Sequence, residues 1–165
     1  MNSIDRRREQ FLDLADRYQG IIAKVCSIYA SGSSPFADLY QEVMINLWNG
    51  LESFRGDAKI TTWIYRIALN TCLSSLRRNQ RHSGNRLPIE AAFDIADTIA
   101  PEKAEIEELY RMISKLEPID KALITLWLDE KSYDEISAIV GISKANVATR
   151  LFRAKQRLSK MAETL

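Results

Sequence analysis

The stretch YDEISAIVGISKANVATRLF, residues 133–152, decides the fold of the C-terminal half of this chain. It holds two short segments whose apolar residues recur every three or four positions, the spacing of one face of an α-helix. Gly141 separates the segments where the chain must turn, and glycine adopts a left-handed turn conformation most easily. Ser132 and Glu135 have the spacing of a capping box at the start of the first segment. Two short helices joined by a glycine-containing turn predict a helix-turn-helix.

The second of these helices is the candidate DNA-contacting element. Such a helix lies in the major groove with its N-terminal residues at the base edges, and basic residues in its later turns are placed for phosphates. Basic residues occur on the second helix and not on the first, which favours DNA binding over an αα-hairpin that touches no DNA. The candidate contact residues are Ser143, Lys144, Asn146, Ala148, Thr149, Arg150, Arg153 and Arg157.

Charge is distributed unevenly around this motif. The net charge of the 165 residues is only +1, which by itself does not indicate a nucleic-acid partner. Residues 66–86 carry arginines and no acid, residues 144–165 are strongly basic, and residues 90–117 are rich in acids. Basic blocks of this kind suit phosphate contacts. Solvated helices can be equally charged, so charge alone leaves both interpretations open.

Helical periodicity extends over most of the chain and predicts an all-α fold of two small helical domains. We expect a three-helix bundle at residues 1–82 and a four-helix domain with the helix-turn-helix at residues 102–165. Between them, residues 83–101 lose the periodicity and contain Gly84, Pro88 and Pro101, so we expect a flexible linker. The predicted N-terminal helices occupy residues 11–29, 36–51 and 61–78, with Ser34 capping the second and Pro35 at its first position.

The third predicted helix interleaves aromatic, basic and amide residues. Aromatic faces can stack on exposed bases while arginines follow the backbone, so this combination suits single-stranded nucleic acid. Taken in isolation, however, Trp63 and Tyr65 are better explained as core residues of a helical domain. The candidate set on this helix is Trp63, Tyr65, Arg66, Asn70, Arg77 and Arg78.

Nothing in the sequence indicates catalysis or a bound cofactor. Cys26 and Cys72 form no CxxC motif and fall on apolar faces, which favours buried reduced thiols over a redox pair or a metal site. His82 is the single histidine, and neither a glycine-rich phosphate loop nor a nucleophile elbow is present. We therefore expect no metal, no cofactor, no small-molecule substrate and no enzymatic activity. The N-terminus lacks an apolar signal segment and no apolar run is of bilayer length, so we expect a cytoplasmic protein.

Two groups of motifs resemble one protein family. DLYQEV at residues 38–43 with Trp48, FRGD at 54–57, TWIYRIA at 62–68 and Asn70 resemble conserved region 2 of extracytoplasmic-function (ECF) sigma factors of RNA polymerase. SYDEI at 132–136, GIS at 141–143 and RLFRA at 150–154 resemble their region 4. The motifs stand in the family's order, cover nearly the whole chain and are separated by a plausible linker.

The resemblance implies specific roles. The polar side of the second helix would dock on the clamp helices of the polymerase β′ subunit, through Asp38, Gln41, Glu42, Asn46 and Trp48. The loop Phe54, Arg55, Gly56 and Asp57 would act with the third helix to melt the −10 element and capture a flipped base. The helix-turn-helix would bind the −35 element as duplex. The implied partners are bacterial core RNA polymerase (β′ clamp helices and β flap), promoter DNA and an anti-sigma factor, which in this family is often membrane-bound.

The sequence departs from the family pattern at three positions. Ile60 stands where members often have leucine or an aromatic residue, Ser74 where they often have aspartate, and Ala148 where a basic residue is common. A stand-alone helix-turn-helix regulator that acts without core polymerase is the principal alternative, and it predicts duplex binding as a dimer. An adaptor or sigma-like decoy without promoter activity is a further one.

Overall fold

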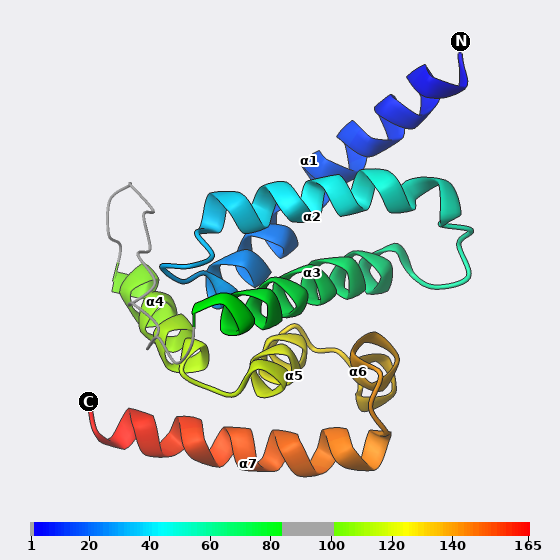
Figure 1. Cartoon of the computed structure of the whole chain (residues 1–165). Coiled ribbons are helices and arrows are strands. Elements are labelled where there is room, and N and C mark those ends of the chain that lie inside the picture. Colours follow the sequence, from blue (N-terminus) through cyan, green and yellow to red (C-terminus); the bar gives the residue numbers. More distant parts are fainter. Residues whose placement is uncertain (1, 84–100) are drawn as a thin grey trace. The chain divides into compact units, whose positions relative to one another are not determined.

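The computed structural model describes residues 2–83 and 101–165, which fold into two compact helical units (Figure 1). Unit 1 contains α1 to α3 and unit 2 contains α4 to α7. Within the described ranges no strand forms, and the single β-bridge joins Ser31 to Ser34 in a turn. The predicted all-α class with two helical domains is confirmed. The predicted linker at 83–101 falls almost entirely outside the described residues.

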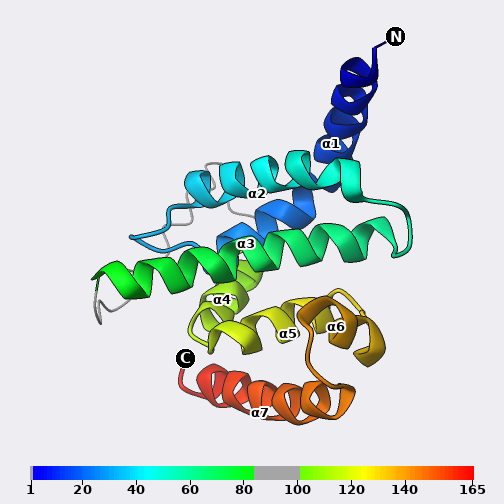
Figure 2. The same cartoon turned by 45° about the vertical axis from the view of Figure 1, so that its right-hand side comes forward.

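In unit 1, α1 (Ser3–Tyr29), α2 (Phe36–Gly50) and α3 (Ile60–Ser83) pack pairwise against one another. A single 3-10 turn, η1 (Leu51–Ser53), follows α2. The N-terminal turns of α1 project beyond the other two helices, as Figures 1 and 2 show. α1 begins earlier than its apolar stripe predicts, because the Asn2 side chain accepts a hydrogen bond from the Ile4 amide and caps the helix.

The core of unit 1 lies where the C-terminal half of α1 meets α2 and α3. Its fully buried side chains include Ile22, Val25, Leu39, Val43 and Ile64. Burial of such a cluster is the main stabilising contribution in a helical bundle. The apolar stripes of the sequence therefore mark the packing surfaces correctly.

The prediction that Ser34 caps α2 is wrong. α2 starts at Phe36 after Pro35, with no side-chain cap. The Ser34 hydroxyl is buried and instead shares a hydrogen bond of 3.0 Å with the Ser75 hydroxyl, and it accepts a second one from the Asn79 amide. These partners belong to α3, so a tertiary contact replaces the local cap and ties the α1–α2 turn to α3.

Both cysteines are free and buried, as predicted. A hydrogen bond with Cys26, followed by burial, raises the pKa of the Cys72 thiol well above its ordinary value. Since the thiolate is the reactive form, this environment disfavours reaction at Cys72.

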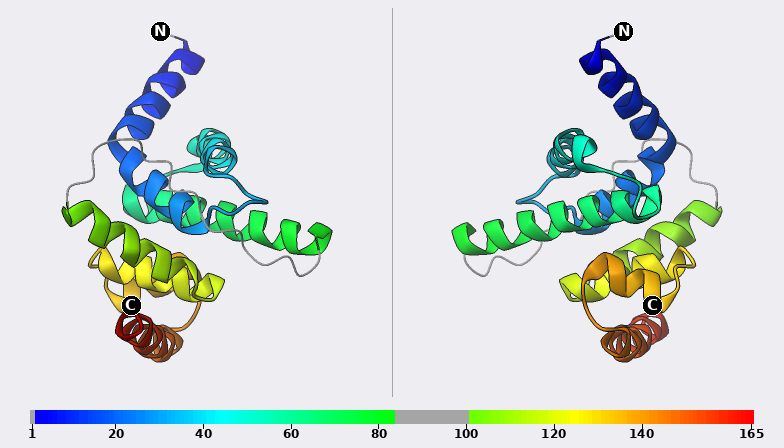
Figure 3. Two further views of the ribbon diagram at one scale, coloured as in Figure 1. Left: turned by 90° about the vertical axis from the view of Figure 1, so that its left-hand side faces the viewer. Right: turned by 90° about the vertical axis from the view of Figure 1, so that its right-hand side faces the viewer.

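Unit 2 contains α4 (Pro101–Ser114), α5 (Pro118–Leu128), α6 (Tyr133–Val140) and α7 (Lys144–Glu163). Helix α5 contacts α4, α6 and α7 (Figure 3), and six of its 11 residues are buried, so it contributes much of the core. Its buried residues Leu123, Ile124 and Leu126 pack with Ile136 of α6 and Leu151 of α7 in the core. No helix of the described ranges is both long and apolar enough to cross a membrane.

Candidate nucleic-acid interface

The helix-turn-helix of unit 2 forms as predicted, and local contacts explain its geometry. The capping box is complete, since the Ser132 hydroxyl accepts from the Glu135 amide and the Glu135 carboxylate accepts from the Ser132 amide. Gly141 ends α6 with φ +81°, which a residue with a side chain adopts only at a cost. The Ser137 hydroxyl donates to the Ile142 carbonyl at 2.5 Å and closes the turn. Together these contacts fix the angle at which α7 leaves the turn.

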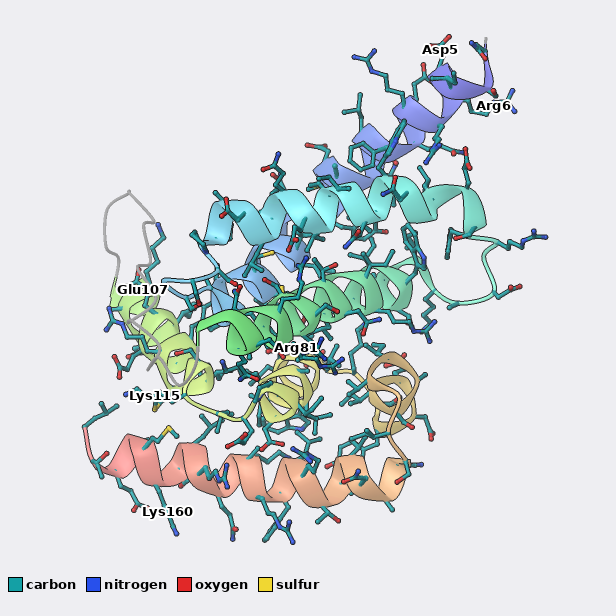
Figure 4. The ribbon with its side chains drawn as sticks, viewed as in Figure 1. Asp5, Arg6, Arg81, Glu107, Lys115 and Lys160 are labelled. Atoms are coloured by element: carbon teal, nitrogen blue, oxygen red, sulfur yellow. The ribbon has the colours of Figure 1, made fainter. Side chains whose placement is uncertain are left out.

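α7 presents most of its predicted contact residues to solvent. Val147, Leu151 and Ala154 form its buried face, and Figure 4 shows Lys160 projecting from the side away from α5. Ser143 is the N-cap, its hydroxyl accepting from the Asn146 amide at 3.1 Å. Lys144 pairs with Asp134 of α6 at 3.3 Å, and Ala148 is half-buried. Six of the predicted residues are exposed: Ser143, Lys144, Asn146, Thr149, Arg153 and Arg157.

Arg150 differs from the other arginines of α7. Its Nε donates to Asp120 Oδ1 on α5 at 3.0 Å, in an ion pair whose aspartate is largely buried. Arg150 is thus both a structural link between α5 and α7 and a half-exposed side chain on the candidate interface. The partners are 30 positions apart in the sequence, so no local sequence pattern reveals this pair.

Phe152, which is 64% exposed beside Arg153, is not among the contact residues predicted from sequence. An exposed aromatic side chain on a recognition helix can contact thymine methyl groups. The signal that would have found it is its position next to Leu151, which occupies the buried stripe. A large apolar residue off that stripe has no core to enter.

In unit 1, the loop before α3 is held by an aromatic pair. The Phe54 and Trp63 rings lie 4.9 Å apart between centroids, and both side chains are half-buried. Gly50 leaves room for this indole, because a Cβ there would stand 3.3 Å from the Trp63 ring. Arg55, Gly56 and Asp57 are exposed between these anchors, with Gly56 at φ +78°. The predicted loop residues therefore form a turn that is exposed to solvent and held in place by the Phe54–Trp63 contact.

Tyr65 requires a correction. Its side chain is 1% exposed, and its hydroxyl accepts a hydrogen bond from Lys24 Nζ at 3.2 Å. A side chain buried in this way cannot stack on a base while α3 stays packed against α1. We therefore remove Tyr65 from the candidate DNA contacts. Of the other predicted residues on α3, Arg66 is half-buried, and three are exposed: Asn70, Arg77 and Arg78.

The predicted polymerase-contacting residues of α2 divide into two groups. Asp38, Gln41, Glu42 and Asn46 lie on its polar side, where Asp38 and Gln41 are exposed and Asn46 donates to Thr71 Oγ1 at 2.9 Å. Trp48 instead packs against α1. Its ring meets Phe11 edge-on at 5.4 Å, and the Arg7 guanidinium lies 4.3 Å above it. Trp48 is thus a packing residue of unit 1, which the α2 sequence alone does not reveal.

A groove of about 590 Å³ runs between α2 and α3. Glu42 and Asn46 contribute to one wall and Asn70 and Arg78 to the other, and a 2.8 Å ion pair joins Arg78 to Glu42. Ile45 lines the groove while 51% exposed, so the groove combines an apolar side chain with polar groups. The structure brings the predicted polymerase-contacting and DNA-contacting residues together at this groove.

Comparison with known proteins identifies the family. Residues 14–82 match the family model for sigma-70 region 2, and residues 106–158 match that for sigma-70 region 4. The ECF RNA polymerase sigma-E factor of Escherichia coli K12 is 34% identical, over 92% of this chain and 86% of that protein. This chain belongs to the ECF sigma factors. The ECF sigma factor SigM of Mycobacterium tuberculosis is 27% identical over 93% of this sigma factor and 78% of its own length.

Solved structures agree with this fold. CnrH, solved with the cytosolic domain of CnrY, has a TM-score of 0.67 at 20% identity and covers 95% of this chain and 90% of its own. The sigma factor RpoE of Bartonella quintana, solved with the anti-sigma factor NepR, has a TM-score of 0.74 at 20% identity and covers 96% and 97%. The family assignment favours a sigma factor over a stand-alone regulator. Sigma factors bind core RNA polymerase and promoter DNA and are not themselves catalytic enzymes.

Proposed function

We propose that this sigma factor divides promoter recognition between its two units. Unit 1 binds core RNA polymerase through the polar side of α2 and melts the −10 element with the 54–57 loop and α3. Unit 2 contacts the −35 element as duplex through α7. The observation that carries the proposal is the groove between α2 and α3, whose two walls carry residues expected to contact polymerase and DNA, respectively.

The electrostatics of α7 support its part in the proposal. Arg153 and Arg157 are exposed, and neither forms an ion pair within residues 2–83 and 101–165. Free guanidinium groups bind phosphates and release condensed counterions, which favours association with duplex DNA. The proposed −35 contacts are Ser143, Lys144, Asn146, Ala148, Thr149, Arg150, Arg153 and Arg157, together with Phe152.

The exposure of side chains on α3 supports the proposed −10 contacts. Trp63 is half-buried on the Phe54 ring, so part of its indole remains available to a base that leaves the DNA stack. Asn70 and Arg77 lie further along α3 and are exposed. Arg78 is also exposed, but its pairing with Glu42 must loosen or be shared when DNA binds.

The domain boundaries and partners belong to the same proposal. Residues 1–82 form the region 2 domain, residues 102–165 form the region 4 domain, and residues 83–101 connect them. The acidic part of this connection would occupy the RNA exit channel, and unit 2 would rest on the β flap. We also propose an anti-sigma factor as a regulator, because two structurally similar proteins were solved as complexes, one of them with a named anti-sigma factor. Binding to core polymerase places the protein in the cytoplasm.

Run-off transcription tests the proposal. Core RNA polymerase, the purified protein and a library of promoter fragments from the source organism should give transcripts that are absent without the protein. Binding of the protein alone to promoter duplex should be weak. Specific duplex binding without polymerase, combined with no new transcripts, would contradict the proposal and support a stand-alone regulator.

A further inference from the structure

The pairing of Asp120 with Arg150 has a geometry suited to directing an arginine at a ligand. Asp120 lies at the start of α5 and is 7% exposed, whereas Arg150 lies two turns into α7. The bond joins Arg150 Nε to Asp120 Oδ1 at 3.0 Å. It therefore uses one of the five N–H donors of the guanidinium.

The other donors of Arg150 remain available. No hydrogen bond or ion pair joins its two η nitrogens to any residue of the described ranges. Within those ranges the only buried side-chain nitrogen or oxygen without a partner is Arg7 Nε, so the Arg150 η nitrogens reach solvent. Arg150 is thus held at Nε and open along its η edge.

Holding an arginine in this way changes how it binds DNA. An arginine without a protein partner loses rotamer entropy when it binds DNA, and its guanidinium is not oriented toward the acceptor atoms beforehand. A fixed guanidinium has lost this freedom before binding, so it favours acceptors at one position and in one orientation. A carboxylate beside it also disfavours a phosphate, because like charges repel. A guanine edge, with two neutral acceptors, is the preferred ligand for such a group.

We propose that Asp120 is a positioning residue that directs Arg150 at a guanine in the −35 duplex. Arg153 and Arg157, which are exposed on α7, supply affinity for the phosphates instead. The inference rests on the proposed −35 contact of α7. It assigns a specificity role to a residue of α5 outside the helix-turn-helix.

The test uses holoenzyme assembled from core polymerase and the full-length protein. A promoter found by run-off transcription is randomised at its −35 hexamer, and bound fragments are sequenced to give the base preference at each position. Arg150→Ala should reduce the preference for guanine at one position roughly fivefold or more. Asp120→Asn should reduce the preference at that same position, and it should add nothing in the Arg150→Ala background.

Two further variants keep the test informative if Asp120→Asn unfolds unit 2. Arg150→Lys retains the charge and can still pair with Asp120, but lysine has no second donor edge, so the same preference should be lost while the fold is kept. Asp120→Glu retains a carboxylate and should restore part of the preference. Asp134→Asn is the matched control, because it removes an exposed partner of Lys144 from the same unit and should leave the Arg150 position unchanged.

The outcomes distinguish a failure of the inference about Asp120 from a failure of the proposed −35 contact of α7. Equal weakening at all six positions, or an Asp120→Asn effect that persists without Arg150, would show a merely structural role and overturn the inference. Loss of preference in Arg150→Ala but not in Asp120→Asn would also overturn it while leaving the −35 contact intact. An unchanged guanine preference in Arg150→Ala, together with unchanged affinity and salt dependence in Arg153→Ala, would instead refute the proposed function of α7.

Discussion

At the scale of single residues, exposure decides which aromatic side chains of α3 can act on DNA. Trp63 rests half-buried on Phe54, whereas Tyr65, two positions later, is buried and bonded to Lys24. The sequence places both on one helix but cannot show which of them faces the core, because helix rotation is fixed by packing against α1. The interpretation of Tyr65 as a core residue, which its isolated context favours, is the one the structure supports.

Substitution separates these two aromatics. Trp63→Ala combined with Asn70→Ala should abolish open-complex formation and spare core polymerase binding, because the bases of the −10 element lose their stacking and polar partners. Tyr65→Phe is the control, expected to lower the free energy of unfolding by about 1 kcal/mol through the lost Lys24 hydrogen bond while leaving melting intact. Permanganate footprinting measures melting. Full melting in the double variant would refute the −10 assignment.

The buried thiol of Cys72 makes a second residue-scale prediction. Its pKa is raised by the hydrogen bond with Cys26 and by burial, so the folded protein holds the proton that the unfolded chain releases above about pH 8.5. The contribution of this thiol to stability is therefore complete below that pH and declines above it. Between pH 7 and pH 10, the free energy of unfolding measured with urea should fall more steeply with pH for wild type than for Cys72→Ala. Equal slopes for the two proteins would contradict the assignment.

At the scale of elements, the helix-turn-helix was predictable from sequence because its determinants are local. The capping box and Gly141 act within a few residues of one another, so spacing alone defines α6 and the turn. The first residue of α2 was predicted correctly, but the role of Ser34 was not predictable, since Ser34 bonds to Ser75 and Asn79 on a distant helix. The same limit applies to Trp48 with Arg7 and to Arg150 with Asp120, where the partner lies tens of residues away.

Substitutions at Gly141 and Gly20 test whether the positive φ explains the glycine in the turn of the helix-turn-helix. A Cβ added at Gly141 or at Gly20 would meet no other atom within 4 Å, but only Gly141 has a positive φ, at +81°. Gly141→Ala should therefore destabilise unit 2 by about 1–2 kcal/mol. Gly20→Ala, within α1, should stabilise unit 1 by roughly 0.5–1 kcal/mol through lower backbone entropy in the unfolded chain. Chemical denaturation measures both, and effects of the same sign would refute the explanation.

The later turns of α7 provide an electrostatic prediction. Arg153→Ala and Arg157→Ala should each weaken holoenzyme binding to −35 duplex and reduce the slope of log K against log salt by about 1, because each removes one phosphate contact. Base preference should be retained, in contrast to the Arg150 variants. Fluorescence anisotropy over a range of salt concentrations gives the slope. A slope that matches wild type would remove these arginines from the interface.

At the scale of the whole molecule, the two units have separate cores, and each has its own proposed ligand. The family match also divides, with region 2 in one unit and region 4 in the other. Covalent connection then matters through effective concentration: once unit 1 is bound to polymerase, unit 2 meets the −35 duplex as an intramolecular event. Neither unit needs new contacts with the other for this gain.

Separating the units tests this division of labour. Residues 1–82 and 102–165, produced as two polypeptides, should each unfold cooperatively, since the buried residues of each core lie within one unit. Residues 1–82 should retain core polymerase binding and compete with the intact protein for it. The two pieces added together should direct specific transcription at least ~100-fold less efficiently than the intact chain, because the linkage that supplies effective concentration is lost. Undiminished transcription by the separate pieces would show that the −35 contact is dispensable or is stabilised by polymerase alone, and a fragment that failed to fold would contradict the independence of the two cores.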